Sequence, residues 1–421
     1  MTENYLHHLW KYKLLNLSDC KTECGEEIEI LDFGFHNQDS GPDFYNGKVK
    51  IGNTVWVGNI EIHINSSDWK KHNHQIDKAY DNVILHVVYN HDSEVKTTKG
   101  SIIPTFELKN RIDYTKYEEY ERFIFNKIPC FNSLENVSNI IISNTVERNL
   151  IERLTNKSEE IKEVLVKNNT NWEQTFFQFI CKSLGMKVNS IPMEELAQNT
   201  PVTLFNKLGD NILAIESILF GQAGMLENNA IKDEYYLRLQ KEYQFQKVKN
   251  KLVSVNRVSW KFSKLRPSNF PTIRLAQLAQ LIYKNKSLFH SLIQDKISVK
   301  EIKKVLNVSI DEGFWFSHYT FNKMSKEKKK SIGVVLVNSL IINTISPFLF
   351  VYGKYKAEES FCDKALELLE EISPEDNKIV REFDQKIKCN SAFETQGIIQ
   401  LFNTKCLYKK CLSCGIGISL L

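Results

Sequence analysis

The sequence predicts an α+β protein: an α/β domain comes first, a mostly α-helical region follows, and a short cysteine-bearing tail ends the chain. Three observations predict this class. Apolar and polar residues alternate, as in β-strands, only in the first part of the chain. From Ser138 onward, apolar residues recur at helical spacing. The last segment then gathers three cysteines. We therefore expect domains at residues 1–130, 131–388 and 389–421.

The elements of the first domain follow from local signals. Gly52-Asn53 separates two alternating runs, which is typical of a β-hairpin turn. Ser66, Ser67 and Asp68 resemble a helix N-cap cluster. The expected order is a helix at Glu3–Leu15, a strand at Ile28–Asp32, strands at Asp43–Ile51 and Val55–Ile64, a helix at Trp69–Tyr80, a buried strand at Val83–Tyr89, a strand at Ile102–Leu108 and a helix at Tyr114–Phe125.

The later region is expected to be almost entirely helical. The segments with helical spacing are Asn139–Val166, Trp172–Leu184, Asn211–Leu226, Tyr235–Tyr243, Phe270–Lys284, Lys328–Ile345, Ala357–Ile372 and Ser373–Phe402. One stretch, Ser331–Gly353, contains no charged residue and is long enough to resemble a membrane span. Its asparagines, serines and proline are poor lipid contacts, so a buried core helix is favoured.

Composition narrows the function classes. The net charge of +4 is too small to indicate nucleic-acid binding by itself, so the distribution of charge must decide. The N-terminal segment lacks the apolar run of a signal peptide. Nine unevenly spaced cysteines favour reduced thiols with a metal site over a disulfide framework. We expect a cytoplasmic protein that does not enter a membrane.

The strongest candidate for chemistry is Asp43 with Glu61 and His63. Glu61 and His63 are two residues apart on one strand and therefore share a face. Two carboxylates on a rigid strand pair are the hard oxygen ligands that a divalent cation needs in order to cleave a phosphodiester. Glu3 and His7, one turn apart on the first helix, could face the same cleft. The alternative is a structural hairpin with surface carboxylates.

Pro42-Asp43 followed by Glu61-Ile62-His63 resembles the motif of the PD-(D/E)XK nuclease superfamily. The core of this restriction-endonuclease-like fold is a helix, three strands, a helix and a strand, the order expected above. The resemblance implies that Asp43 and Glu61 hold Mg²⁺ or Mn²⁺, with Glu3 assisting. His63 stands where the family has lysine, which leaves its role as base, ligand or charge stabiliser open.

Three more histidines lie near this motif. His72 and His74 are two residues apart, so on a helix they would point to different faces and serve as surface residues or phosphate contacts. If the chain is extended there, both could join His63 on a zinc ion. His86 lies within an apolar strand and is expected to be a core histidine with a satisfied hydrogen bond.

The tail carries Cys406, Cys411 and Cys414, followed by Gly415-Ile416-Gly417. This spacing suits a zinc site or a [4Fe–4S] cluster, and either needs a fourth ligand. Cys389 is the nearest candidate in the sequence, and Cys130 is the alternative. Labile redox thiols or a purely structural role remain open.

A basic stretch, Arg238–Arg274, contains many cations, a single acid and interleaved aromatic residues. Cations that hold phosphates and aromatics that stack on bases are typical of nucleic-acid grooves. The residues expected to contact the nucleic acid are Lys261, Lys264, Arg266 and Arg274, with His72 and His74. The alternative is a solvated helix face followed by core aromatics.

Several segments together, among them LHHLWK (Leu6–Lys11), GPDF, GNIEIH, SSDWKKHNH, YDNVILHVVY and RPSNFPTIRLAQL (Arg266–Leu278), resemble a bacterial family known only as a domain of unknown function. The leading hypothesis is a divalent-metal-dependent nuclease acting on DNA or RNA. The alternatives are a non-catalytic nucleic-acid-binding protein on a nuclease-like scaffold, and a zinc-dependent hydrolase built on His63, His72 and His74.

Overall fold

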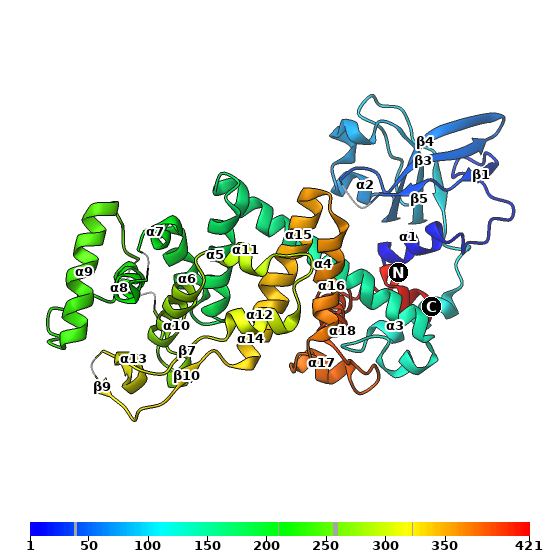
Figure 1. Ribbon diagram of the computed structural model, residues 1–421. Helices are drawn as coiled ribbons and strands as arrows, with labels where there is room; N and C mark the ends of the chain where they lie inside the picture. The colour runs from blue at the N-terminus through cyan, green and yellow to red at the C-terminus, as the bar shows by residue number, and fades with distance from the viewer. Residues whose placement is uncertain (38–39, 209, 256–259, 322) are drawn as a thin grey trace. The chain divides into compact units, whose positions relative to one another are not determined.

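The computed structural model describes residues 1–37, 40–208, 210–255, 260–321 and 323–421, and it confirms the α+β class. The chain forms two compact units (Figure 1). Unit 1 comprises Met1–Ile142 and Asn403–Leu421, and unit 2 comprises Ser143–Phe402. Of the expected tail, residues 403–421 thus fall in unit 1 and residues 389–402 in unit 2. Leu412 packs against the apolar core of unit 1.

Unit 1 is built on a six-stranded mixed sheet with the order β1-β3-β4-β5-β6, and β2 pairs with β3 outside this path (Figure 1). The antiparallel part contains β1 (Ile28–Asp32), β2 (Phe35–His36), β3 (Phe44–Ile51) and β4 (Thr54–Asn65). The next two strands, β5 (Val83–Asn90) and β6 (Thr105–Glu107), are parallel to β4 and to each other. Helix α1 (Glu3–Lys11) packs against β4.

The predicted hairpin is confirmed. Strands β3 and β4 pair from Ile51 opposite Thr54 to Phe44 opposite Ile60, and Gly52 in the turn has a positive φ of 57°. Ile60 and Ile62 are fully buried in the core that α1 also contributes to. The hairpin thus fixes the residues on either side of Phe44 and Ile60, which include Asp43 and Glu61.

The helix expected over Trp69–Tyr80 is not continuous. Helix α2 (Asp68–Lys71) ends after one turn, and two short 3₁₀ turns follow at His74–Ile76 and Lys78–Tyr80. Asn73 adopts the left-handed conformation, with φ 64°, and stops the helix. The Asp77 side chain then accepts a hydrogen bond from the Ala79 amide and opens the second turn. The remaining helix of the first half of unit 1 is α3 (Tyr114–Ile124).

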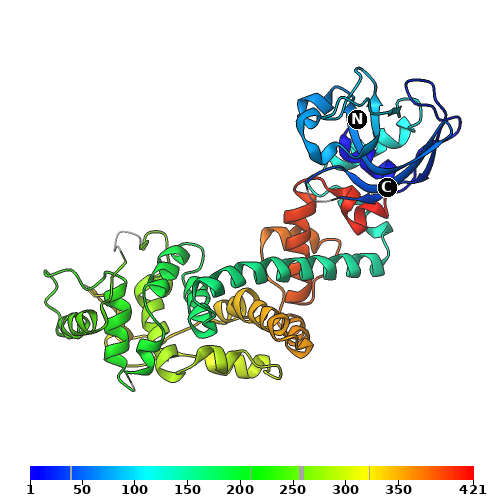
Figure 2. The same cartoon turned by 90° about the horizontal axis from the view of Figure 1, so that it is seen from above.

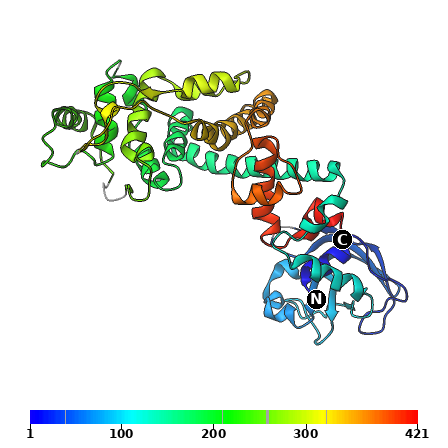
Figure 3. The same ribbon diagram turned by 90° about the horizontal axis from the view of Figure 1, so that it is seen from below.

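Unit 2 is almost entirely helical, as expected. Its long first helix, α4 (Asn139–Lys167), begins in unit 1, and α18 lies beside it in Figures 2 and 3. The helices after α4 are α5 (Trp172–Leu184), α6 (Ser190–Gln198), α7 (Thr203–Asn206), α8 (Ile212–Gln222), α9 (Glu234–Asn250), α10 (Pro271–Lys284), α11 (Leu288–Leu292), α12 (Val299–Leu306), α13 (Phe314–Ser317), α14 (Val334–Leu340), α15 (Ser346–Lys356), α16 (Glu359–Glu371), α17 (Lys378–Phe383) and α18 (Ala392–Leu401). Two small antiparallel pairs join β7 (Ser309–Ile310) to β10 (Lys330–Ser331) and β8 (His318–Thr320) to β9 (Lys323–Met324).

Two helix boundaries differ from expectation. The apolar helix does not start at Lys328, because Lys330 and Ser331 pair with β7; α14, a π-helical turn and α15 instead run from Val334 to Lys356. This helix is long and apolar enough to cross a membrane, and 72% of its most apolar window is buried inside the protein. The expected helix Ser373–Phe402 is split into α17 and α18, with Cys389 in the connection.

Candidate metal centre

Asp43 and Glu61 meet at the end of the β3–β4 hairpin. The backbone amide of Asp43 donates to Glu61 Oε2 at 3.0 Å, and the amide of Ile62 donates to Asp43 Oδ2 at 2.9 Å. Each carboxylate is therefore held by a backbone group of the other strand. Glu61 is only 4% exposed, so its second oxygen faces a protein interior rather than solvent. A purely structural hairpin with surface carboxylates does not describe this arrangement.

Glu61 Oε1 lies beside two histidines, and a third histidine contacts one of these two. It is 3.3 Å from His74 Nε2 and 3.6 Å from His63 Nε2, and His63 Nε2 lies 3.1 Å from His72 Nδ1. One ring nitrogen each from His63, His72 and His74 falls within 4.8 Å of the others. Four ligands placed at 2.0–2.1 Å round a tetrahedral zinc ion are about 3.3 Å apart. The three nearest separations are close to that spacing, and the donor atoms that all lie within 4.8 Å of one another are those of the three histidines, without Glu61.

The broken helix brings His72 and His74 together. The left-handed Asn73 between them reverses the side-chain direction, so both rings approach His63. Trp69 fixes this segment: its ring is fully buried, packs on His74 and His86, and donates through Nε1 to the Lys96 carbonyl at 3.1 Å. The chain is therefore not extended here, and a turn brings the two histidines to His63.

His86 lies behind His63 on the neighbouring parallel strand. Its Nε2 is 2.8 Å from His63 Nδ1, and both rings are fully buried. A cation at His63 Nε2 requires the ring proton on Nδ1, which then donates to His86 Nε2. Metal-ligating histidines almost always donate their second N–H to such a partner, and the partner fixes the ring orientation. His86 is therefore placed to orient His63.

A second ligand set adjoins the first. Single donor atoms of Glu3, His7 and Asp43 also fall within 4.8 Å of one another. His7 Nε2 is 3.2 Å from Asp43 Oδ2 and 4.0 Å from Glu3 Oε1, yet this buried nitrogen has no properly directed hydrogen bond. The sets are connected through the Asp43–Glu61 hydrogen bond. A buried, unsatisfied nitrogen beside two carboxylates fits a cation-binding position.

The protonation states suit cation binding. Burial, and then the charge of Asp43, raise the pKa of Glu61 to about 9. Burial also raises the pKa of Glu3, and Asp43 adds to that shift. Burial and the neighbouring histidines lower the pKa of His63 to about 2, and burial lowers the pKa of His74. Mutually repelling carboxylates and neutral imidazoles are both stabilised by a bound cation.

A cationic pocket in unit 1 opens beside His7. Its volume is about 420 Å³, and its walls come from α1, Tyr120 and the tail. None of the described residues that line it is acidic. The charged and titratable side chains that do so are Lys11, Lys405, Lys409, Lys410, His7, His8 and His36. Sequence reasoning missed this pocket because its two walls lie at opposite ends of the chain and no local pattern connects them.

The tail cysteines join Cys130, not Cys389. The thiols of Cys406 and Cys411 interact electrostatically with Cys130, and Cys130 interacts with Cys414. Cys389 belongs to unit 2, where its charged neighbours are Glu394, Asp384 and Lys388. Cys389 is nearer to the tail cysteines in the sequence, but Cys130 is the candidate for the fourth ligand that lies near them in the fold.

The cations of the basic stretch Arg238–Arg274 that were predicted to contact nucleic acid differ in solvent exposure. Lys261, Lys264 and Arg266 are exposed, whereas Arg274 is buried and donates to Gln277 and Asn269, each at 2.7 Å. Burial lowers the pKa of Arg274 to about 10. This arginine holds the start of α10 and is not accessible to a phosphate. Residues 256–259, which include Arg257, lie outside the described residues.

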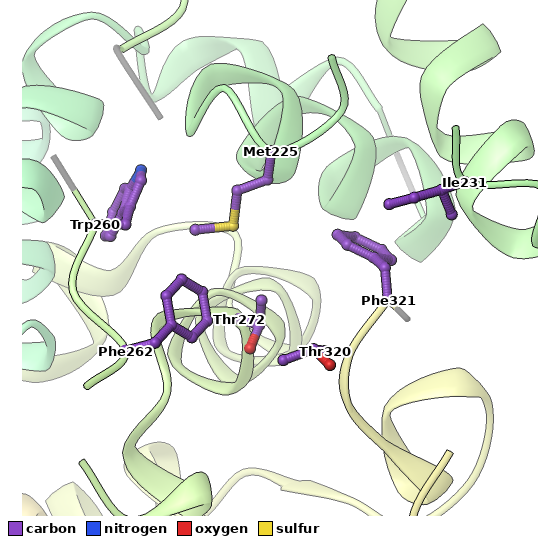
Figure 4. Close-up of a pocket in the computed structure, with 7 residues that line it drawn as sticks. All are labelled: Met225, Ile231, Trp260, Phe262, Thr272, Thr320 and Phe321. Carbon is purple, nitrogen blue, oxygen red and sulfur yellow. The ribbon is translucent and has the colours of Figure 1, made fainter. Parts of the chain in front are cut away.

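Most aromatic residues of this stretch are buried or half-buried, whereas Phe245 is 58% exposed. Trp260 is 7% exposed and donates to the Ala223 carbonyl at 2.8 Å. Trp260 and Phe262 line an apolar pocket of about 360 Å³, and Figure 4 shows Met225, Thr272 and Phe321 round the same space. Trp260 and Phe262 are therefore not arranged as a surface on which bases stack, which weakens one of the two features that favoured a nucleic-acid groove here.

The fold and the site define an α+β protein with a cluster of histidines and carboxylates in its N-terminal unit that is a candidate cation-binding centre. The chain belongs to a protein family described as a protein of unknown function, DUF2851, whose model matches residues 3–378. Comparisons with curated proteins and with solved structures gave no significant match. The family match includes every ligand candidate of the centre and ends before the tail cysteines.

Proposed function

We propose that this protein is a metal-dependent phosphodiesterase acting on nucleic acid, with its principal metal held by His63, His72, His74 and Glu61. The observation that carries the proposal is that one ring nitrogen each from His63, His72 and His74 lies within 4.8 Å of the others, with Glu61 Oε1 3.3 Å from His74 Nε2 and 3.6 Å from His63 Nε2. A bound transition metal lowers the pKa of a coordinated water and supplies a nucleophile at neutral pH.

The donor set favours Zn²⁺ or Mn²⁺ over Mg²⁺. Three imidazole nitrogens suit transition metals, whereas Mg²⁺ prefers oxygen ligands and retains several waters. Asp43 and Glu61 also each use one oxygen on a backbone amide, so they offer fewer free oxygens than an all-carboxylate site. The second set, Glu3, His7 and Asp43, is the better place for Mg²⁺ or Mn²⁺.

The residues of the second set have a further role. Burial disfavours a charged His7, but contact with Asp43 outweighs it and raises the pKa of His7. When no cation occupies the second set, the imidazole can therefore hold a proton near neutral pH and deliver it to a leaving oxygen at the mouth of the cationic pocket. Asp43, which accepts from the Ile62 amide, keeps that ring in place.

Two observations support a phosphodiester as the substrate. The pocket next to His7 carries four lysines, and such cations bind the phosphates that flank a scissile bond. The order of elements from α1 to β5, with β4 parallel to β5, also has the sequence of helix, strands, helical segment and strand that the PD-(D/E)XK resemblance implies. His63 replaces the lysine of that motif, which agrees with a histidine-bound metal.

The test uses metal-free protein reloaded with Zn²⁺, Mn²⁺ or Mg²⁺ and assayed on labelled single-stranded DNA, duplex DNA and RNA. We expect cleavage with a transition metal, and a loss of at least about a hundredfold in H74A and in E61Q. The matched controls, H290A and E29Q, change exposed residues outside the centre and should cleave like the parent. Full activity in an Asp43→Asn/Glu61→Gln double variant would show that the site is wrong.

The main alternative is a non-catalytic nucleic-acid-binding protein on the same scaffold. It predicts binding that weakens steeply with salt, no dependence on metal, and no cleavage of any of the three substrates. Because the histidine spacing is independent of the cationic pocket, metal content alone separates the readings: a protein that binds no transition metal but does bind oligonucleotides selects the alternative.

A further inference from the structure

Four cysteines of unit 1 form a second cluster apart from the histidine centre. Cys130, Cys406, Cys411 and Cys414 are each 6–7% exposed. Cys130 precedes a short 3₁₀ turn near the end of the N-terminal segment, and the other three belong to the tail. Lys409 Nζ donates to the carbonyl of Asn126, which ties the loop between Cys406 and Cys411 to the segment that leads to Cys130.

The backbone round the tail cysteines is shaped for ligation by sulfur. The amides of Ile416 and Gly417 donate to the Cys414 sulfur, and the Cys414 amide donates to the Cys411 carbonyl at 3.1 Å. A Cβ at Gly417 would collide with the Cys411 carbonyl, so this position needs glycine. Amides directed at a cysteine sulfur stabilise a thiolate that is bound to a metal.

We propose that Cys130, Cys406, Cys411 and Cys414 hold a [4Fe–4S] cluster that fastens the tail to the N-terminal part of unit 1. Among the described residues, no three of these sulfurs lie within 4.8 Å of one another. Four thiolates at about 2.3 Å from one zinc ion would all lie within roughly 4 Å of each other. A cluster in which each sulfur binds a different iron accommodates the wider spacing.

The cluster has a consequence for the cationic pocket. Lys405, Lys409 and Lys410, which line that pocket, stand beside or between Cys406 and Cys411. Fixing both cysteines holds the lysine loop against α1, next to His7. This role of the cluster rests on the proposed function, whereas the presence of the cluster does not.

The experiment compares full-length C130S and C389S with the parent, all purified without oxygen. Both cysteines are free and buried, at 7% and 9% exposure, so the pair is matched. We expect about four irons and four acid-labile sulfides in the parent and in C389S, and loss of most of both in C130S. Zinc without sulfide in the parent would overturn the cluster, and so would iron retained by C130S or lost by C389S.

If C130S fails to fold, cysteine alkylation of the parent decides instead. Cys130 and the three tail cysteines should become reactive together when iron is removed, with Cys389 unchanged; independent reactivity would overturn the proposal.

Oligonucleotide affinity separates the two proposals. C130S should bind about as weakly as a Lys405/Lys409/Lys410 triple glutamine variant, while intact iron in a protein that binds no oligonucleotide would contradict only the proposed function.

Discussion

Metal binding at the histidine centre should release about one proton per chain at pH 7, and Glu61 is its source. Burial and the Asp43 charge raise the pKa of Glu61 to about 9, so at pH 7 about 99% of the metal-free chains carry that proton. His63 is already neutral, because burial lowers its pKa to about 2. A cation beside Glu61 favours the carboxylate and displaces the proton.

The magnitude follows from this competition. Between pH 6.5 and 8.5 the apparent affinity for Mn²⁺ should rise about tenfold per pH unit, roughly a hundredfold in all. Titration calorimetry in buffers of different ionisation enthalpy measures both the affinity and the protons released. Glu61→Gln is the control: it should bind Mn²⁺ more weakly, release no proton and show little pH dependence. An affinity in the parent that changes less than about twofold, without proton release, would refute the reasoning.

Three further outcomes follow from the same structure. The metal-free protein should lose stability as pH rises from about 7 to about 9, because folded Glu61 holds a proton that the unfolded chain, with a pKa of 4.5, has released. Below about pH 6.5 the lowered pKa values of His63 and His86 act in the opposite direction, because the unfolded imidazoles take up protons that the folded ones do not. Urea denaturation between about pH 7 and about pH 9 checks this, and a flat profile contradicts it. Replacing Lys405, Lys409 and Lys410 by Gln should reduce the salt slope of oligonucleotide binding by roughly two units, measured by fluorescence anisotropy, whereas the same change in three exposed cations of unit 2 should not. His86→Leu should weaken metal binding about 10–100-fold in competition with a chromophoric chelator, and His86→Gln less, since the amide can still accept from His63 Nδ1.

The part of the site that could be predicted from the sequence is the pair Asp43 and Glu61, because a tight turn fixes this part. Gly52-Asn53 sets the register of β3 and β4, and that register places Asp43 next to Glu61. Both the turn and the alternation are local signals, so the meeting of the two carboxylates could be anticipated from a short window of sequence.

The other half depends on the tertiary structure. His72 and His74 converge only because Asn73 takes a left-handed conformation that ends α2, while the local pattern favours a continuous helix. That conformation is held by Trp69 and by the Asp92 carboxylate, which accepts from Ser66 and Ser67. Asparagine is enriched at such positions, so Asn73 was the available signal.

The choice between Cys389 and Cys130 also depends on how the chain is divided. Cys389 is nearer in the sequence to the tail, but it lies in the connection before α18, within unit 2. The helical segment continues across the boundary after Phe402, as the π-helical turn Phe402–Cys406 that follows α18, so neither a loop nor a helix-breaking residue marks the boundary in the sequence.

The insertion of unit 2 into unit 1 explains how the two ends of the chain come to share one site. Helices α4 and α18, near the start and end of unit 2, are in contact: a Cβ at Gly397 would collide with the Val146 carbonyl, and Gln400 donates to Glu152 at 3.1 Å. The chain therefore leaves unit 1 and re-enters it at neighbouring points. This return brings the tail lysines to the pocket beside His7, so the first helix and the tail build the walls of that pocket jointly.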